Sequence, residues 1–514
     1  MKKLFTILFI ILIVASVFTY RTLPGAIKDK PVLYWVTDAN PARTEQIRTF
    51  KKWLHRTYPE VPEIEILVDT ANAAPEKILI QAVSGVCGDL IDHTDGSSMR
   101  FRKSVGILDD LTDEAKAMGF DLSKTFPAIV SEVSTPVKMV GPDGKVTYET
   151  RQFAFPCNVF SDMMWVNPEA FEKVGMAVPA RRWSVDDFER IGREFVMRSN
   201  ASNKTQRVFF VADMEPEYLA RSAGGSLFNE TETAPTVNSP AMVNAFKLRY
   251  KWTYQNPRLL PTASERNSFS ANSGYGGAGL AMFAQGNYGL VSGGRYLLIQ
   301  FRKITEERLA TGMGPLRLAV SEFPHWEMPI AKAGARATAV FSGGKNRDLA
   351  KYFMAFLASE DYNMNIVEDA DALPPNPKFV ELEAFKRPKN HPEEWGCHEA
   401  FSESMDTIAV PAESSPFVID EVVTRLFKKA QDYHLNNRKT AEESLAELDD
   451  LIRDEIKRSL EEDADLRPLY EERCRVQEKI NALRAKGEKV PISWIINPYL
   501  KHWYQFKGWA DMDK

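Results

Sequence analysis

Short apolar runs alternate with segments of helical periodicity along the first part of the chain. Val, Ile, Leu and aromatic residues are concentrated in 32–36, 63–68 and 89–92, which predicts three strands. Between them, apolar side chains recur at helical spacing in 47–54 and in 75–83, where a proline opens the second helix. This alternation of strand and helix predicts a mostly parallel sheet with helices on both faces.

A second α/β region begins near Phe153 and contains several segments with helical spacing. The clearest runs from Ser184 to Met197, because Ser184 is a favourable N-cap residue and acidic residues at 186 and 187 suit the first helical turn. At 514 residues the chain is longer than one hydrophobic core usually supports. We therefore expect two lobes and an appendage.

The chain changes character beyond about residue 436, where charged residues dominate. Apolar positions at helical spacing predict one amphipathic helix, with the stripe Leu445, Leu448, Ile452 and Ile456. A second helix is predicted over 468–486, with the stripe Leu469, Val476, Ile480 and Leu483. An isolated helix of this length is marginal in water, so we expect it to dock against the second lobe.

The N-terminus has the pattern of an export signal. Lys2 and Lys3 precede a mainly apolar run over 4–20, which is the charge order of a secretory signal peptide. The run also approaches the length that crosses a bilayer, so segment 1–27 is interpreted as either a cleaved signal peptide or an uncleaved anchor. Both interpretations place the rest of the chain outside the cytoplasm, in the periplasm or its equivalent.

The composition favours an ordinary globular protein and argues against nucleic acid as a partner. Hydrophobic residues make up 44% of the chain and charged residues 26%. The 65 basic and 70 acidic residues are interspersed, so the net charge of -5 offers no basic field for a phosphate backbone. The cysteines show no paired spacing, and we expect buried, unpaired thiols at Cys87, Cys157, Cys397 and Cys474.

Motifs for catalysis or cofactor binding are incomplete in this sequence. The glycines at 274, 276 and 279 follow a polar stretch, so we interpret them as a flexible loop before a strand at 280–283. A cluster of His391, Cys397 and His398 lacks the second half-site that zinc needs. Neither a Gly-x-Ser-x-Gly elbow nor a His-Glu-x-x-His helix occurs. We predict no metal, no cofactor and no enzymatic activity.

Three segments in the middle of the chain follow one another in a specific order. They are Phe155-Pro156-Cys157-Asn158, the stretch from Met164-Trp165-Val166-Asn167-Pro168 to Gly175, and Trp183-Ser184-Val185-Asp186-Asp187-Phe188. This order resembles the signature of extracellular solute-binding proteins of ABC transporters, the family that includes maltose-binding proteins. Segments 218–228, 279–296 and 343–375 resemble further parts of the same family, and the last includes the crossover Leu373-Pro374-Pro375. The resemblance covers roughly residues 31–460.

The resemblance implies an α/β fold of the two-lobed, type II periplasmic-binding-protein kind, with discontinuous lobes and a cleft between them. On this reading residues 31–145 with 322–372 form the N-terminal lobe, and 146–321 with 373–460 form the C-terminal lobe. Residues 461–514 exceed the usual end of the family and form a helical, aromatic-rich extension.

Candidate ligand-binding residues lie where strands of the predicted sheets end, because ligands of open α/β sheets sit at the carboxyl ends of strands. The first lobe is expected to contribute Trp35, Asp38, Asn40, Thr94 and Asp95, with Asn158 on a crossover strand. From the resemblance, Gly293, Arg295 and Tyr296 would serve from the second lobe. Trp35 or Tyr296 is the expected platform for a sugar ring, since sugars stack on aromatic faces.

These features together predict the extracytoplasmic substrate-binding component of an ABC importer. Its partners would be a small polar ligand, in particular a mono- or oligosaccharide, and the permease subunits of the transporter. Two alternatives remain open at this point. A secreted α/β enzyme would carry titratable groups with perturbed pKa values in the cleft, and a sensory or structural protein would use the C-terminal extension as its working part.

Overall fold

The computed structural model describes residues 9–16, 18, 30–70, 75–141, 146–202, 206–268 and 277–512. Residues 9–16 are helical. Most of the predicted export segment, 1–27, lies outside the described residues, as do Gly274 and Gly276. Within the described ranges, no helix combines the length and the apolar character needed to cross a membrane.

The first sheet contains the three strands that the N-terminal pattern predicts. Strand β1 lies between β2 and β3 and runs parallel to both, and β11 then pairs antiparallel with β3. Two further strands, β12 and β6, pair with β11. The bounds are β1 (Val32–Val36), β2 (Glu65–Asp69), β3 (Leu90–His93), β6 (Ala154–Ser161), β11 (Ala331–Val340) and β12 (Ala409–Val410).

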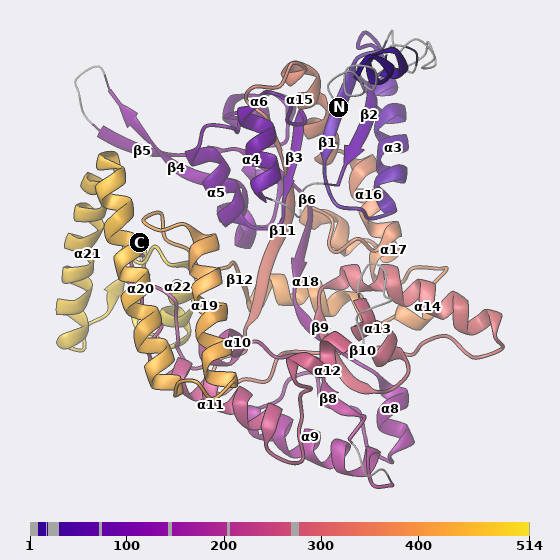
Figure 1. Ribbon diagram of the computed structural model, residues 1–514, viewed down its shortest axis with the longest axis vertical. Coiled ribbons are helices and arrows are strands. Elements are labelled where there is room, and N and C mark those ends of the chain that lie inside the picture. Colours follow the sequence, from indigo (N-terminus) through magenta and orange to yellow (C-terminus); the bar gives the residue numbers. More distant parts are fainter. Residues whose placement is uncertain are drawn as a thin grey trace.

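Helices cover this sheet as the alternating pattern predicts (Figure 1). Helix α3 (Ala42–Thr57) buries Phe50 and Leu54 in the same core as α15 (Arg347–Leu357). The predicted helix over 75–83 is also present, and its Ile78 is buried while Ile80 and Val83 are exposed. The other helices of this part are α4 (Pro75–Val83), α5 (Gly96–Ser104), α6 (Thr112–Met118), α7 (Val130–Val133) and α16 (Glu360–Asp369).

A second sheet organises the second lobe, with strand order β10-β7-β9-β8. Ser184 accepts a hydrogen bond from the amide of Asp187 and so caps α9 (Val185–Ser199), as predicted. The strands are β7 (Met163–Val166), β8 (Phe209–Val211), β9 (Tyr288–Gly293) and β10 (Ala319–Ser321). Around them lie α8 (Pro168–Lys173), α10 (Pro216–Arg221), α11 (Pro240–Tyr254), α12 (Ala263–Ser268), α14 (Leu298–Ala310), α17 (Glu383–Lys386) and α18 (His398–Thr407).

The prediction of a strand at 280–283 is wrong. These residues belong to helix α13 (Gly277–Ala284), and the strand of the family segment begins later, at Tyr288. Gly286 adopts a φ of +81°, a left-handed conformation that glycine adopts easily, and it separates the helix from β9. A short apolar run has no periodicity of its own, so its sequence did not distinguish helix from strand.

Two antiparallel helices, α19 (Asp420–Leu435) and α20 (Ala441–Glu462), pack on the core of the second lobe. Helix α20 begins with a complete capping box, in which the Thr440 and Glu443 side chains each bond the other's backbone amide. The predicted stripe of Leu445, Leu448, Ile452 and Ile456 is buried. This confirms the amphipathic helix that the sequence predicts.

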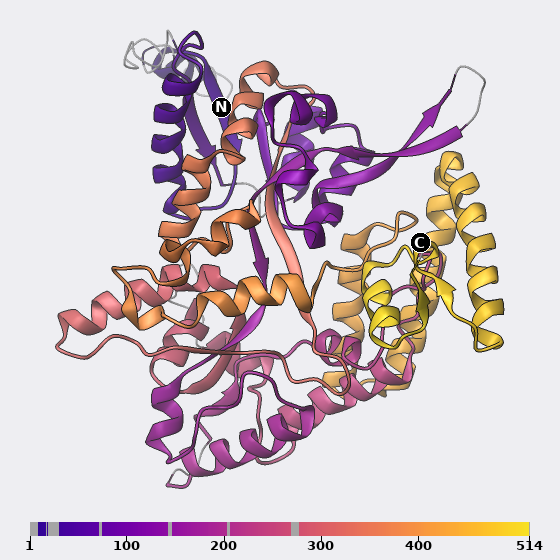
Figure 2. The same ribbon diagram turned by 180° about the vertical axis from the view of Figure 1, so that it is seen from behind.

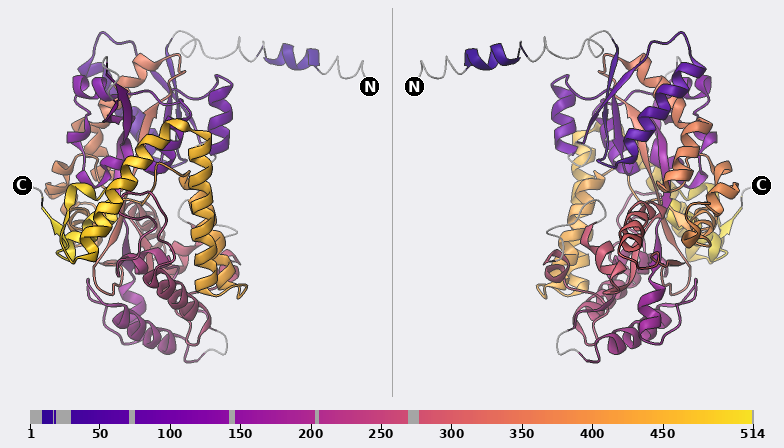
Figure 3. Two further views of the ribbon diagram at one scale, coloured as in Figure 1. Left: turned by 90° about the vertical axis from the view of Figure 1, so that its left-hand side faces the viewer. Right: turned by 90° about the vertical axis from the view of Figure 1, so that its right-hand side faces the viewer.

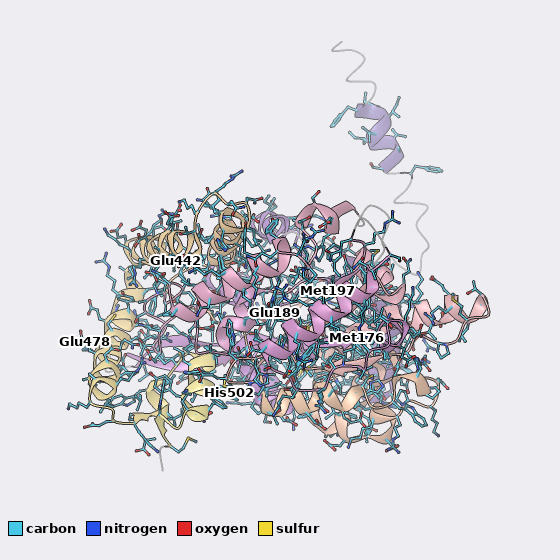
Figure 4. All side chains as sticks on the ribbon, turned by 90° about the horizontal axis from the view of Figure 1, so that it is seen from below. Met176, Glu189, Met197, Glu442, Glu478 and His502 are labelled. Carbon is cyan, nitrogen blue, oxygen red and sulfur yellow. The ribbon has the colours of Figure 1, made fainter. Side chains whose placement is uncertain are left out.

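The C-terminal extension docks against the second lobe, which confirms the expected docking. Figure 3 shows α20 and α21 (Arg467–Ala485) meeting at a sharp bend. Ile480 is buried, while Leu469, Val476 and Leu483 are partly buried against neighbouring hydrophobic clusters. The chain ends with β13 (Val490–Pro491), α22 (Pro498–Phe506) and β14 (Ala510–Asp511). Seen from below, Glu442 of α20 and Glu478 of α21 lie on one side of the molecule, away from Met176 and Met197 (Figure 4).

The molecule is two-lobed, with separate hydrophobic clusters in the two halves. Strands β6 and β11 run through both: Ala333 packs in a cluster of the second lobe, whereas Ala337 and Ala339 pack in one of the first. A hairpin of β4 (Ser134–Val140) and β5 (Val146–Gln152) extends from the first lobe toward α20 and α21 (Figures 1 and 2).

Candidate ligand cleft

A cavity of about 920 Å³ lies between the two lobes. One wall is formed by the end of β3 and the first turns of α5, and the other by one face of α19 and the turn after it. Val423 and Phe427 of α19 belong to the core of the second lobe, whereas Met99 of α5 belongs to a core of the first. The cavity is therefore an interlobe cleft.

The first wall is positioned by the start of α5. Asp95 caps this helix by accepting a hydrogen bond from the amide of Ser98 at 2.7 Å. Its side chain also accepts a hydrogen bond from the Ser97 hydroxyl, which leaves both polar groups at the cavity edge. Thr94 is exposed beside them.

Two side chains of this wall are buried without a full set of partners among the described residues: His93 lacks hydrogen bonds and Arg102 lacks an ion pair. His93 is 2% exposed, and neither ring nitrogen has a hydrogen-bonding partner among the described residues. Burial, together with the nearby Arg102, lowers the pKa of His93 to about 3, so the ring is neutral at physiological pH. Arg102 is 4% exposed and donates to the Asp92 carbonyl at 2.7 Å. No described carboxylate forms an ion pair with Arg102, and burial lowers its pKa.

The opposite wall carries basic side chains at helical spacing on α19. Arg425 and Lys428 are exposed, and neither makes an ion pair with a described carboxylate. The Tyr433 ring is approached by Lys429 at 5.3 Å and by Arg438 at 6.0 Å from its centroid. Acidic groups are fewer here, namely Glu421 and Asp432.

A salt bridge joins the two walls beside the cavity. Arg100 of α5 bonds Asp420 at the start of α19, with 3.2 Å between Nη2 and Oδ2. Behind it, the buried Glu132 accepts a hydrogen bond from the amide of Gly96 at 2.6 Å. Burial raises the pKa of Asp420 and of Glu132 to about 7 each, against the opposing effect of Arg100.

Of the nine sequence-predicted site residues, Thr94 and Asp95 line this cavity. Trp35 does not, because its side chain is fully buried and packs on Phe353 at 4.9 Å, with its indole N–H bonded to Asp92 at 2.8 Å. In this structure Trp35 therefore offers no ring face to a ligand. Its role is to hold the Asp92 carboxylate in the core.

Asp38, Asn40 and Asn158 lie near a buried ionic network at the junction of the lobes. Asp38 accepts two hydrogen bonds from Arg43, each of 2.9 Å, and Asn40 accepts one from the amide of Ala42 at 3.0 Å. Asn158 is buried in β6, in register with Arg336. Figure 1 shows β6 and β11 side by side at this junction.

Gly293, Arg295 and Tyr296 form a structural turn in this conformation. Gly293 has φ +156°, and a Cβ there would approach the Leu297 side chain to 2.6 Å. Arg295 is fully buried and donates to His398 Nδ1 at 2.9 Å and to the Ala372 carbonyl at 2.7 Å. The half-buried Tyr296 ring packs edge-on against Phe160, with 6.0 Å between centroids.

The second wall of the cleft was missed by sequence reasoning. The sequence does contain the corresponding pattern, since Arg425, Lys428 and Asp432 fall on one face of a helix whose opposite face is apolar. A solvated helix surface has the same pattern, so only the position of α19 opposite β3 distinguishes the two.

The cysteines and the histidine cluster lie outside the residues that line the cavity. Cys157 and Cys397 are buried, but Cys87 and Cys474 are only partly so, and all four are free thiols. Burial raises the pKa of Cys397 to about 12. His391 lies near Glu393 and Glu394, but Glu394 is held by two hydrogen bonds from Arg302, at 2.7 and 2.9 Å. The Glu394 carboxylate thus has Arg302 as its counter-ion.

The family of the chain follows from a model that matches residues 44–364 and is described as bacterial extracellular solute-binding protein. This match covers more than half of the sequence. The chain belongs to the bacterial extracellular solute-binding proteins. A comparison with curated proteins found no match.

Solved structures share the fold of this solute-binding protein. An ABC substrate-binding protein from Listeria monocytogenes, in complex with cycloalternan, has a TM-score of 0.64 and 19% identity, covering 83% of this chain and 99% of that one. The GacH receptor of Streptomyces glaucescens has a TM-score of 0.62 and 17% identity, with the same shares covered. Maltose-bound MalE3 of T. maritima has a TM-score of 0.60 and 14% identity, covering 82% and 99%. The solute-binding protein is thus longer than these three structures.

Proposed function

We propose that this solute-binding protein is the extracytoplasmic substrate-binding component of an ABC importer and captures a saccharide between its lobes. The observation that carries the proposal is the 920 Å³ cavity between β3/α5 and α19. A cavity of this size suits a small oligosaccharide. The similar structures from Listeria and T. maritima hold cycloalternan and maltose, which supports this class of ligand.

The mechanism is closure of two lobes around the ligand. Thr94, Asp95 and the neutral His93 would bond ligand hydroxyls from the first lobe, while α19 contributes from the second. Closure brings Arg100 to Asp420, so ligand binding and this salt bridge favour the same closed conformation. Permease subunits then recognise the closed form.

The division into lobes is part of the proposal. Residues 31–145 with 322–372 and residues 146–321 with 373–460 are the proposed lobes, joined by the long strands β6 and β11. The segregation of buried side chains into separate clusters supports two lobes that move as units. Limited proteolysis that released either lobe as one continuous fragment would contradict this division.

The cellular setting is also proposed. Export by segment 1–27, as a signal peptide or an anchor, would place the chain outside the cytoplasm, where its permease partners present their outer face. We infer binding without catalysis, because the family consists of binding proteins. Western analysis of cell fractions would test the location, and a protein found only in the cytoplasm would contradict it.

A thermal-shift screen of the full chain against a carbohydrate panel tests the function. A saccharide at 100 times its dissociation constant should stabilise the folded state by about 2.7 kcal/mol. The variant Asp95→Ala also removes the cap of α5, so Thr94→Val is the better probe of the cleft, with Thr407→Val as an exposed control elsewhere. The proposed function fails if no neutral or charged saccharide stabilises the protein.

A further inference from the structure

The cleft has a charge balance that differs from that of the whole chain. Among the described residues, five basic and three acidic side chains line it, whereas acidic residues outnumber basic ones in the whole sequence, 70 to 65. The basic groups come from both lobes: Arg102 from the first, and Arg425 and Lys428 from the second. An anion between the walls would therefore be held from both sides.

Arg102 is the strongest sign of an anionic ligand. A guanidinium that is 4% exposed usually has a carboxylate partner, since burial of an uncompensated charge is costly. Here its hydrogen-bond acceptor is the carbonyl of Asp92, and no described carboxylate lies within ion-pair distance. The carboxylates of Asp92, Asp95 and Glu421 attract Arg102 only from beyond ion-pair distance. A ligand carboxylate or sulfate in the cavity would supply the short, direct ion pair that Arg102 lacks among the described residues.

His93 provides an independent observation. This buried imidazole lines the same cavity, and neither of its nitrogens has a partner among the described residues. A neutral imidazole carries one N–H donor and one acceptor. Buried polar groups are nearly always satisfied, so a ligand with hydroxyl groups beside its charged group would complete the site.

The cleft is poor in the groups that bind neutral sugars. Tyr433 is the one aromatic side chain among the described lining residues, and Lys429 and Arg438 approach its ring. Stacking of a neutral sugar face needs an open aromatic platform. The cations around Tyr433 instead add positive charge at that point.

We propose, resting on the function proposed above, that the ligand is an acidic saccharide whose carboxylate or sulfate group is held by Arg102, Arg425 and Lys428. The sugar hydroxyls bond His93, Thr94 and Asp95 at the first wall. A carboxylate and a sulfate share the same chemistry, because each is an oxyanion that accepts hydrogen bonds from guanidinium and ammonium groups.

Calorimetry with pairs of ligands that share a sugar skeleton and differ in charge tests the proposal on the full chain. One pair is trigalacturonate and its methyl ester, the other is neocarrabiose 4-sulfate and desulfated neocarrabiose, and maltotriose is the neutral reference. At least one acidic member should bind at least about tenfold more tightly than its neutral counterpart, because bonds to charged groups are the strong ones. Its affinity should fall when NaCl is raised, since salt screens exposed charges.

Variants locate the charge recognition. The double variant Arg425→Gln with Lys428→Gln should lower the affinity for the acidic ligand about tenfold and leave the affinity for a neutral saccharide unchanged. Both side chains are exposed, so the fold tolerates these changes. Lys457→Gln, an exposed lysine on α20 outside the cleft, is the matched control and should change nothing. Arg102→Gln should weaken binding of the acidic ligand further. If the Arg102→Gln variant does not fold, the double variant at Arg425 and Lys428 still tests the proposal.

The outcomes separate the two proposals. Equal affinity for acid and ester, or tighter binding of maltotriose, would contradict the proposal of an acidic ligand. The proposed binding of a saccharide would still hold. Binding of neither acid also overturns it. Failure of every saccharide, neutral and charged, removes the proposed function itself.

Discussion

Arg100 and Asp420 are 320 positions apart in the sequence, yet their side chains meet at 3.2 Å and join the two lobes beside the cleft. Both are largely shielded from solvent, with side-chain exposures of 21% and 13%. Arg100 also donates to the Ser131 carbonyl at 3.1 Å, which holds it against its own lobe. A second pair, Lys138 and Asp465 at 3.0 Å, links the β4–β5 hairpin to the extension but is much more exposed.

We predict that Arg100→Gln combined with Asp420→Asn opens the cleft. Loss of the pair should destabilise the closed state by about 1 kcal/mol. This shifts the equilibrium between closed and open states about fivefold toward the open one. Small-angle scattering of the free protein should show a larger radius of gyration. Arg458→Gln, which breaks an exposed pair with Glu455 within α20, is the control and should leave the scattering profile unchanged.

Glu132→Gln should stabilise the protein at pH 8 and have little effect at pH 4. The pKa of Glu132 is raised from 4.5 to about 7 by burial, so its favourable contribution is complete below the unfolded pKa and is lost as pH rises through about 7. The amide keeps an oxygen to accept the hydrogen bond from Gly96. Urea unfolding should give a gain of about 1–3 kcal/mol at pH 8.

The control is Glu478→Gln, an exposed acidic residue of α21 whose substitution should leave the free energy of unfolding unchanged at both pH values. A gain for Glu132→Gln of the same size at both pH values would contradict the prediction, since it would point to packing instead of charge.

Asn497→Ala should loosen the C-terminal extension. The side chain is fully buried, donates to Glu413 at 2.9 Å and to the Phe228 carbonyl at 3.1 Å, and caps α22 through the amide of Tyr499. Loss of a cap and of buried hydrogen bonds should cost about 2–4 kcal/mol. Hydrogen exchange should accelerate across 490–511.

Gln505→Ala, on the exposed face of the same helix, should leave exchange across the extension unchanged. Fast exchange throughout 468–486 in the unaltered monomer would refute the docked extension and favour assembly with another chain.

Arg295→Lys should destabilise the fold and leave the ligand affinity of the folded protein intact. Four hydrogen bonds hold this guanidinium, to His398 and to the carbonyls of 366, 367 and 372. Lysine cannot reproduce this planar pattern, so we expect a loss of about 2–4 kcal/mol in urea unfolding. Arg317→Lys, at an exposed pair with Glu172, is the control. Normal stability with weakened saccharide binding would instead place Arg295 in the ligand site.

The sequence alone determined most of the local structure and the family. Strands 32–36 and 89–92, the Ser184 cap and the buried stripe of α20 depend on residues within a few positions of one another, so their pattern is readable without the fold. The helix at 277–284 was misread because a short apolar run has no period of its own. The position of Thr94 and Asp95 at the edge of the sheet was predictable, because strand ends in such sheets meet at one edge; their binding of a ligand stays a prediction.

Only the tertiary structure decided which residues face the cleft. Trp35 and Arg295 sit at strand ends in the sequence but are buried in the cores, whereas Arg425 and Lys428 look like any solvated helix face until α19 is placed opposite β3. The meaning of Arg102 depends on burial and on the absence of a described carboxylate beside it. Burial and charge pairing arise from packing between segments that are hundreds of residues apart, and local sequence periodicity carries no information about such distances.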